Sequence, residues 1–171
     1  MKFNSYLTYL AVLATLGLAQ TIPANTPVRF RLAEDTEVCL GAVTNARQAE
    51  ILVTACDSPN TIFQLTMGGP NETTDIVLAE SLSGGPILCI TARNSLAGNT
   101  PVILDLCEDD IWEHWRVSSG TGTGPGEILS AVPTNGDYCL AAQHAGLGDP
   151  ILFAGSSDAF SQQWVVDIIG D

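Results

Sequence analysis

The chain has 171 residues, a length typical of one domain, and its 19 acidic residues against six basic ones give a formal net charge of −13. Nucleic acids are polyanions that bind clustered Lys and Arg, so this balance argues against a nucleic-acid partner. An anionic membrane surface is disfavoured for the same reason. Solubility accounts for the acidity without any partner.

The first segment, residues 1–19, has the pattern of a secretory signal peptide. Lys2 precedes a mainly apolar stretch at 7–18, and the small residues at 17 and 19 fit a cleavage site after Ala19. The stretch is short for crossing a bilayer, which argues against a membrane anchor, and no later stretch is apolar enough to insert into one. We therefore expect a secreted, extracellular protein with a single mature domain at 20–171, whose five arginines and 19 acidic residues give a formal charge of −14.

Five cysteines lie in this mature part, and in a secreted chain they indicate a disulfide framework with one thiol left over. The interval from Cys39 to Cys89 is 50 residues, and so is the interval from Cys89 to Cys139. A fixed period of this size indicates internal repeats.

Three copies of one unit can be read from these cysteines. Each copy has Cys followed by Leu or Ile, then a polar loop, and then a run rich in β-forming residues, at 51–53, 102–104 and 151–153. A further strand-like run lies before each Cys, at 28–33, 75–79 and 127–132. Helical periodicity of useful length is absent, so the pattern predicts four short strands per copy and twelve in all.

Each copy ends on an aromatic residue, and a polar residue lies two positions before it. The third copy reads Gln162-Gln163-Trp164, a Q-x-W triplet. The corresponding residues are Glu113 and Trp115 in the second copy, and Thr61 and Phe63 in the first.

Three units of about 50 residues with this Cys and Q-x-W pattern resemble the ricin B-type lectin domain, and the resemblance covers essentially the whole mature chain. It implies an all-β fold, a β-trefoil of three four-stranded repeats. It also implies that the aromatic residue of each triplet anchors the core, while the Gln amide satisfies backbone groups of the loop above.

The resemblance further implies disulfides Cys39–Cys56 and Cys89–Cys107, each tying two strands of one repeat. The corresponding partner of Cys139 is Ser156, so Cys139 is expected to be a free thiol. A reactive nucleophile is one interpretation of that thiol, and a buried half-cystine that lost its partner is the favoured one.

In ricin B-type lectins a galactose site combines an Asp two residues after the first Cys, an aromatic two residues before the second Cys, and an Asn just before the Q-x-W Gln. The Asp position holds Gly41, Thr91 and Ala141 in the three copies. The aromatic position holds Thr54, Asp105 and Ala154. The Asn position holds Asn60, Trp112 and Ser161, so no copy carries the full set.

Candidate carbohydrate-binding residues can still be ranked by copy. Copy two ranks first because Thr91, Asp105 and Trp112 place a hydroxyl, a carboxylate and an aromatic near one rim, although Trp112 alternatively packs against its own loop. Copy one ranks second, with Asn60 and, in the loop after its first Cys, Asn45. Copy three ranks last, as purely structural.

Catalytic chemistry has weaker candidates. The acidic cluster at 108–110 could bind a cation or supply a carboxylate pair, but a solvated turn is the favoured interpretation. His114 and His144 lie in unrelated places and form no triad pattern, so we expect no enzyme, no metal and no cofactor. Asn71, in the triplet Asn-Glu-Thr, is a predicted glycosylation acceptor.

The predicted function is therefore a secreted, non-catalytic carbohydrate-binding module whose partner is a glycan or glycoprotein. The alternative is a secreted β-trefoil with degenerate sugar pockets that binds a protein target, as a protease inhibitor or a host-directed effector does. Long surface loops on a rigid scaffold suit that use.

Overall fold

The computed structural model describes residues 21–70, 72–92, 98–120, 124–134, 136–157 and 159–170. The expected signal peptide at 1–19 and the expected glycosylation site Asn71 lie outside the described residues, so both stay predictions.

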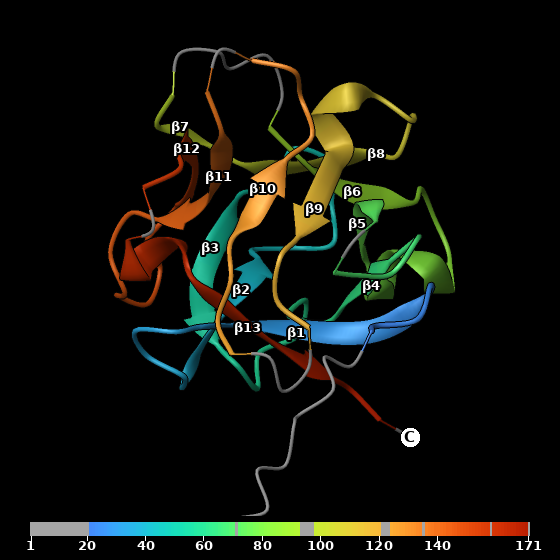
Figure 1. Cartoon of the computed structure of the whole chain (residues 1–171). Coiled ribbons are helices and arrows are strands. Elements are labelled where there is room, and N and C mark those ends of the chain that lie inside the picture. The colour runs from blue at the N-terminus through green and yellow to red at the C-terminus, as the bar shows by residue number, and fades with distance from the viewer. Residues whose placement is uncertain are drawn as a thin grey trace, which may run out of the picture.

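Strands dominate the described chain, and the helical segments are three short 3-10 turns, η1 to η3 (Figure 1). In β1 the buried side chains alternate with half-buried ones, as expected for a strand with one face on the core. The elements, in chain order, are β1 (Thr26–Leu32), β2 (Val38–Ala42), β3 (Ile51–Ala55), β4 (Phe63–Leu65), β5 (Thr73–Leu78), η1 (Ala79–Ser83), β6 (Leu88–Thr91), β7 (Thr100–Pro101), β8 (Ile103–Leu106), η2 (Ile111–Glu113), β9 (His114–Val117), β10 (Ile128–Ser130), β11 (Tyr138–Ala142), β12 (Ile151–Gly155), η3 (Phe160–Gln162) and β13 (Trp164–Ile168).

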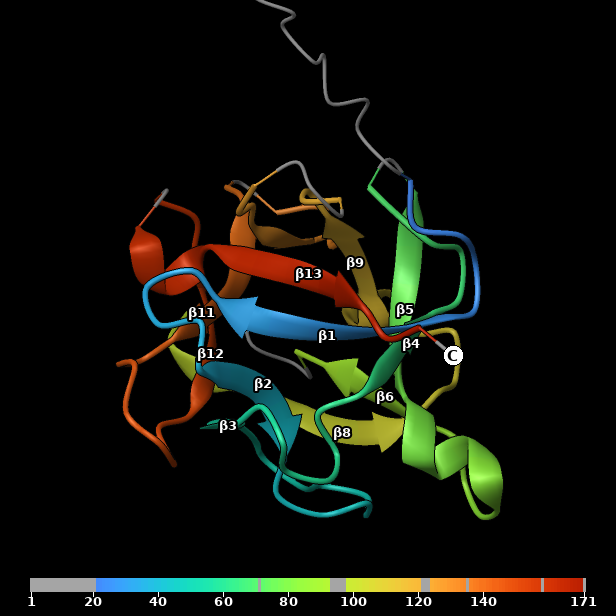
Figure 2. The ribbon, with the colours of Figure 1, turned by 90° about the horizontal axis from the view of Figure 1, so that it is seen from below.

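Six of these strands form a closed barrel. Antiparallel pairing runs from β13 to β1, then to β4, β5, β9 and β10. Figure 2 shows β1 and β13 side by side. The ring closes where Gly126 and Trp164 exchange backbone hydrogen bonds of 3.0 and 2.9 Å. Closure leaves this barrel without exposed strand edges.

Three hairpins, β2–β3, β6–β8 and β11–β12, cap one end of the barrel. Backbone bonds join one hairpin to the next, from Ile51 N–H to the Val102 carbonyl at 3.0 Å and from Val102 N–H to the Ile151 carbonyl at 2.9 Å. A six-stranded barrel capped by three hairpins with threefold repetition is a β-trefoil, as the sequence predicts. Repeat one comprises β1–β4, repeat two β5–β9 and repeat three β10–β13.

The described residues form thirteen strands, one more than the predicted twelve. The addition is β7, a two-residue strand of repeat two that pairs with β12 of repeat three. Val102 separates it from β8, and its pairing extends the contact between two hairpins of the cap. The predicted four strands per repeat are otherwise present.

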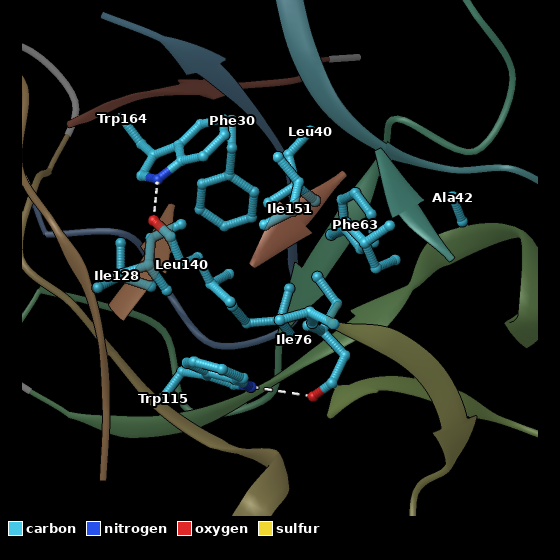
Figure 3. Packing of buried hydrophobic residues seen from close by; sticks show 14 of the residues in the cluster. Phe30, Leu40, Ala42, Phe63, Ile76, Trp115, Ile128, Leu140, Ile151 and Trp164 are labelled. Atoms are coloured by element: carbon cyan, nitrogen blue, oxygen red, sulfur yellow. Dashed lines mark hydrogen bonds between the residues drawn. The ribbon is translucent and has the colours of Figure 1, made fainter. Parts of the chain in front are cut away.

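Two tryptophans lie at equivalent places in the core, and both are fully buried (Figure 3). The indole N–H of Trp164 donates to the Leu140 carbonyl, and that of Trp115 donates to the Ile90 carbonyl, each at 2.9 Å. Phe63 takes the same place in repeat one and is also fully buried. Each indole therefore packs its apolar body in the core while its one polar group is satisfied.

The polar residue two positions before each aromatic ties down the loop above it. Gln162 lies in η3, a 3-10 turn that comes just before β13. Its Oε1 accepts from Ser157 N–H and its Nε2 donates to the Gly155 carbonyl, both at 2.8 Å. In repeat two, Glu113 Oε2 accepts from Glu108 N–H at 3.0 Å. Burial raises the pKa of Glu113 above its usual value, against the opposing effect of such backbone bonds.

The two expected disulfides, Cys39–Cys56 and Cys89–Cys107, are present, with Cα–Cα distances of 4.9 and 5.1 Å. Cys139 is a buried free thiol. Burial, reinforced by the neighbouring carboxylate of Glu127, raises its pKa to about 12. Ser156, at the expected partner position, donates instead to Glu127 at 2.9 Å.

Candidate functional site

The three positions of the lectin pattern converge in repeat three around a surface cavity of about 590 Å³. Ala141 lies on β11, Ala154 lies on β12, and Ser161 lies in η3. Their side chains are small, so the space that larger residues would fill stays open. Two other described cavities, one near Asn60 and one near Arg116, each measure about 310 Å³.

The cavity of repeat three has an uncharged lining without aromatic rings. Its apolar part comes from alanines, prolines and a leucine, and its polar part from amides and hydroxyls. The Gln162 amide and the Ser157 hydroxyl are already engaged with each other at 3.0 Å, which leaves Asn99, Gln143 and Ser161 to face a ligand. The lining residues are Asn99, Pro101, Ala141, Ala142, Gln143, Pro150, Leu152, Ala154, Ser157, Ala159, Ser161 and Gln162.

In repeat two the residue at the corresponding aromatic position, Asp105, forms an ion pair with Arg47 of repeat one. Asp105 is 5% exposed, and its Oδ1 accepts from Arg47 Nε at 2.5 Å. Its other oxygen accepts from Gln48 Nε2 at 2.8 Å. Thr91, which supplies the hydroxyl of the predicted pocket, is 3% exposed. The carboxylate expected to receive sugar hydroxyls is thus already bound by two side chains of repeat one.

Trp112 lies in η2 and is half-buried. Its ring meets the Phe153 ring of repeat three edge-on, with the centroids 6.3 Å apart and the planes at 72°. The contact therefore crosses to another repeat instead of staying within its own loop. Edge-to-face packing of this kind is a favourable aromatic arrangement and uses part of the ring surface.

In repeat one the lectin-pattern positions are closed by their own residues. A Cβ built on Gly41 would lie 2.6 Å from Thr54 Oγ1, so an Asp there would not fit without movement. Asn60 adopts a positive φ of 63° and lines a separate cavity with Ile62 and Ala79. Asn45 is exposed in the loop between β2 and β3. The structure thus does not bring Asn45 and Asn60 to one described cavity.

The acidic loop at 108–110 leads into η2, with Asp110 as the N-cap residue. Asp110 Oδ1 accepts from Trp112 N–H at 3.3 Å, and Glu113 completes a capping box. His114 Nε2 lies 3.1 Å from Asp109 and 3.6 Å from Asp75. Over the described residues, no group of three or more His, Cys, Asp and Glu side chains could hold a metal ion. A helix long and apolar enough to cross a membrane is likewise not found in that part of the chain.

No family model and no curated protein matches this chain. Solved structures do match. The designed 3-fold symmetric protein ThreeFoil has a TM-score of 0.69 at 14% identity, over 82% of this chain and 96% of that one. An exo-β-1,3-galactanase from Clostridium thermocellum has a TM-score of 0.68 at 17% identity, and the match covers 86% of this chain and 31% of that one. A Macrolepiota procera ricin B-like lectin in complex with lactose has a TM-score of 0.64 at 14% identity, and the match covers 87% of this chain and 99% of that one.

These likenesses establish that the chain shares the β-trefoil fold of ricin B-like lectins. The chain spans nearly all of the designed protein and of the lectin but about a third of the galactanase. The fold therefore occurs both as an independent lectin and as part of a larger enzyme, and it does not by itself decide whether a protein is catalytic.

The sequence ranks repeat three last because alanines occupy two of its pattern positions. In the structure, Ala141 and Ala154 line the cavity of about 590 Å³. The sequence of repeat three also gives no hint of Asn99, because this residue belongs to repeat two and reaches the cavity only through the packing of neighbouring hairpins. Its one sequence signal is that it lies 51 residues after Gln48, close to the 50-residue period of the cysteines.

Proposed function

We propose that this protein is a secreted, non-catalytic carbohydrate-binding module, with a single domain at 20–171 that binds a neutral sugar in the cavity of repeat three. The observation that carries the proposal is the position and chemistry of this cavity. It lies where the lectin pattern places a sugar, and it offers amides and hydroxyls beside an apolar floor. Sites for small ligands commonly combine such features.

Charge supports a neutral ligand over an acidic one. The lining contains no cationic side chain to pair with a carboxylate or sulfate. The mature chain is strongly acidic, so it repels anions at a distance. A neutral sugar avoids both penalties and uses the lining amides as combined donors and acceptors.

Secretion is supported by the two disulfides, since such bonds persist in oxidising compartments. Binding without catalysis is supported by the state of the acidic groups near the fold's sugar positions. Asp105 is engaged by Arg47 and Gln48, and Asp110 and Glu113 hold the η2 turn. None of these carboxylates lines the cavity of repeat three.

The other pattern positions have secondary roles in this proposal. Asn60, beside its own smaller cavity, and the exposed Asn45 are proposed as weaker contact points of repeat one. Thr91, Asp105 and Trp112 are proposed to act mainly in joining the repeats, because their polar and aromatic groups already have protein partners or are buried.

A glycan array probed with the mature protein tests the proposal. Neutral glycans should bind, and the best of them should lose binding to the variant Ala154→Leu, whose larger side chain enters the cavity. The matched control is Thr54→Leu, the same position in repeat one, which should keep the affinity of wild type. An array without any glycan signal would refute carbohydrate binding and favour a protein target.

A further inference from the structure

A residue with positive φ recurs at equivalent places between the two strands of each cap hairpin. Their φ values are 67°, 56° and 89°, for Gln48, Asn99 and Gly148. Each donates its backbone N–H to a carbonyl on the corresponding strand of another repeat, at 2.8, 2.7 and 2.8 Å. The acceptors are Leu104, Phe153 and Val53, respectively.

This hydrogen bond places the side chain of one repeat beside the pocket of the next. The residue after each acceptor is the aromatic position of the lectin pattern, which is Asp105 in repeat two. Gln48 shows what the geometry permits, because its Nε2 crosses to Asp105 Oδ2 at 2.8 Å. The preceding residue, Arg47, joins it on the other carboxylate oxygen at 2.5 Å. Together they bind both carboxylate oxygens of Asp105.

The same position has no such partner in repeat three. Asn99 replaces Gln48, and Ala154 replaces Asp105, so the amide faces a residue without a polar side-chain atom. Asn99 lines the cavity, and within the described part of the chain its side chain forms no hydrogen bond. Its backbone is meanwhile held by the 2.7 Å bond to Phe153. An amide presented on a fixed backbone is prepared to bind a ligand at low entropic cost.

We propose that Asn99 is a ligand-binding residue and that the sugar site of repeat three is shared between two repeats, with Asn99 supplying its principal polar contact. This inference rests on the proposed function. One amide can donate to one sugar hydroxyl and accept from its neighbour, which suits a vicinal pair. The lining has no aromatic ring, so binding depends on these hydrogen bonds more than on stacking.

The substitution Asn99→Gly tests this role without changing the backbone, because glycine adopts a positive φ readily. The matched control is Gln48→Gly, at the equivalent position with its own positive φ. Methyl glycosides of galactose, glucose, mannose and N-acetylglucosamine are titrated into the ¹⁵N-labelled mature protein, with methyl glucuronide as the anionic probe. Asn99→Gly should weaken the best neutral glycoside about tenfold, the effect of about 1.4 kcal/mol, while Gln48→Gly leaves its affinity within about twofold.

A second variant recreates in repeat three the amide–carboxylate contact that Gln48 makes with Asp105. In Ala154→Asp the new carboxylate lies where Asp105 lies in repeat two, so Asn99 should bind it and glycoside binding should be lost. The Asn99 side-chain amide signals should then shift on titrating the new carboxyl, a readout that needs no sugar.

The possible failures can be told apart. Glycoside binding by wild type that survives Asn99→Gly unchanged would overturn the role of Asn99 and leave the proposed function standing. Binding of no glycoside by wild type would refute the proposed function itself. In that case, the Ala154→Asp variant still tests the geometry inferred for Asn99. Asn99 side-chain amide signals that do not shift when the new carboxyl is titrated would overturn that geometry.

Discussion

Replacing Trp164 by Phe should destabilise the domain by about 2 kcal/mol. The substitution removes the 2.9 Å hydrogen bond to the Leu140 carbonyl, worth about 1 kcal/mol net. It also removes buried apolar surface on the order of 40 Å², worth about 1 kcal/mol more at roughly 25 cal/mol per Å². Trp164→Ala empties the site and should cost about 3–5 kcal/mol. Trp115→Phe should match Trp164→Phe, since its indole bond to Ile90 has the same length.

Equilibrium unfolding in urea, followed by far-ultraviolet circular dichroism, measures these costs. Trp112→Phe is the control, because Trp112 is half-buried and meets Phe153 at its edge. That variant should lose less than about 1 kcal/mol. If Trp164→Phe lost no more than Trp112→Phe, the indole of Trp164 would not be a core anchor, and the account of the Q-x-W triplet would be wrong.

Two titratable groups give further predictions. Cys139, with a pKa of about 12, should resist iodoacetamide at pH 8 in the folded protein and react with it in urea. Mass spectrometry of the two samples measures the labelling. Labelling of Cys139 in the folded protein would contradict its burial. Burial raises the pKa of Glu113, so its charge lowers stability as pH rises through that pKa. Glu113→Gln should therefore raise the free energy of unfolding by about 0.5–2 kcal/mol at pH 7, and by less as the pH falls towards about 4. An equal rise in the free energy of unfolding at both pH values would show that the buried charge of Glu113 is not what lowers stability.

The fold could be predicted because its determinants are local and repeated. The 50-residue interval between Cys39, Cys89 and Cys139 reveals the repeats, and the apolar runs beside them give the strands. The disulfides Cys39–Cys56 and Cys89–Cys107 follow from the resemblance to the ricin B-type pattern, and each joins the two strands of one hairpin. The degenerate triplet of repeat one was still recognisable because Phe63 keeps a large aromatic at the anchor position.

The site could not be ranked from sequence because it depends on contacts between repeats. Arg47 and Asp105 are 58 residues apart, and only the packing of neighbouring hairpins brings them together. Reading each repeat alone made Asp105 an available ligand for sugar. The same reading treated Ala141 and Ala154 as missing functional groups, whereas between two hairpins they leave a cavity.

The measurement that tests the central claim most directly is chemical-shift mapping of the best neutral glycan from the array on the ¹⁵N-labelled mature protein. Saturable shifts should concentrate at the amides of Asn99, Gln143 and residues 154–162, and they should disappear in Ala154→Leu. Saturable shifts that concentrate instead around Asn60 or Asp105, and persist in Ala154→Leu, would contradict a sugar site in repeat three.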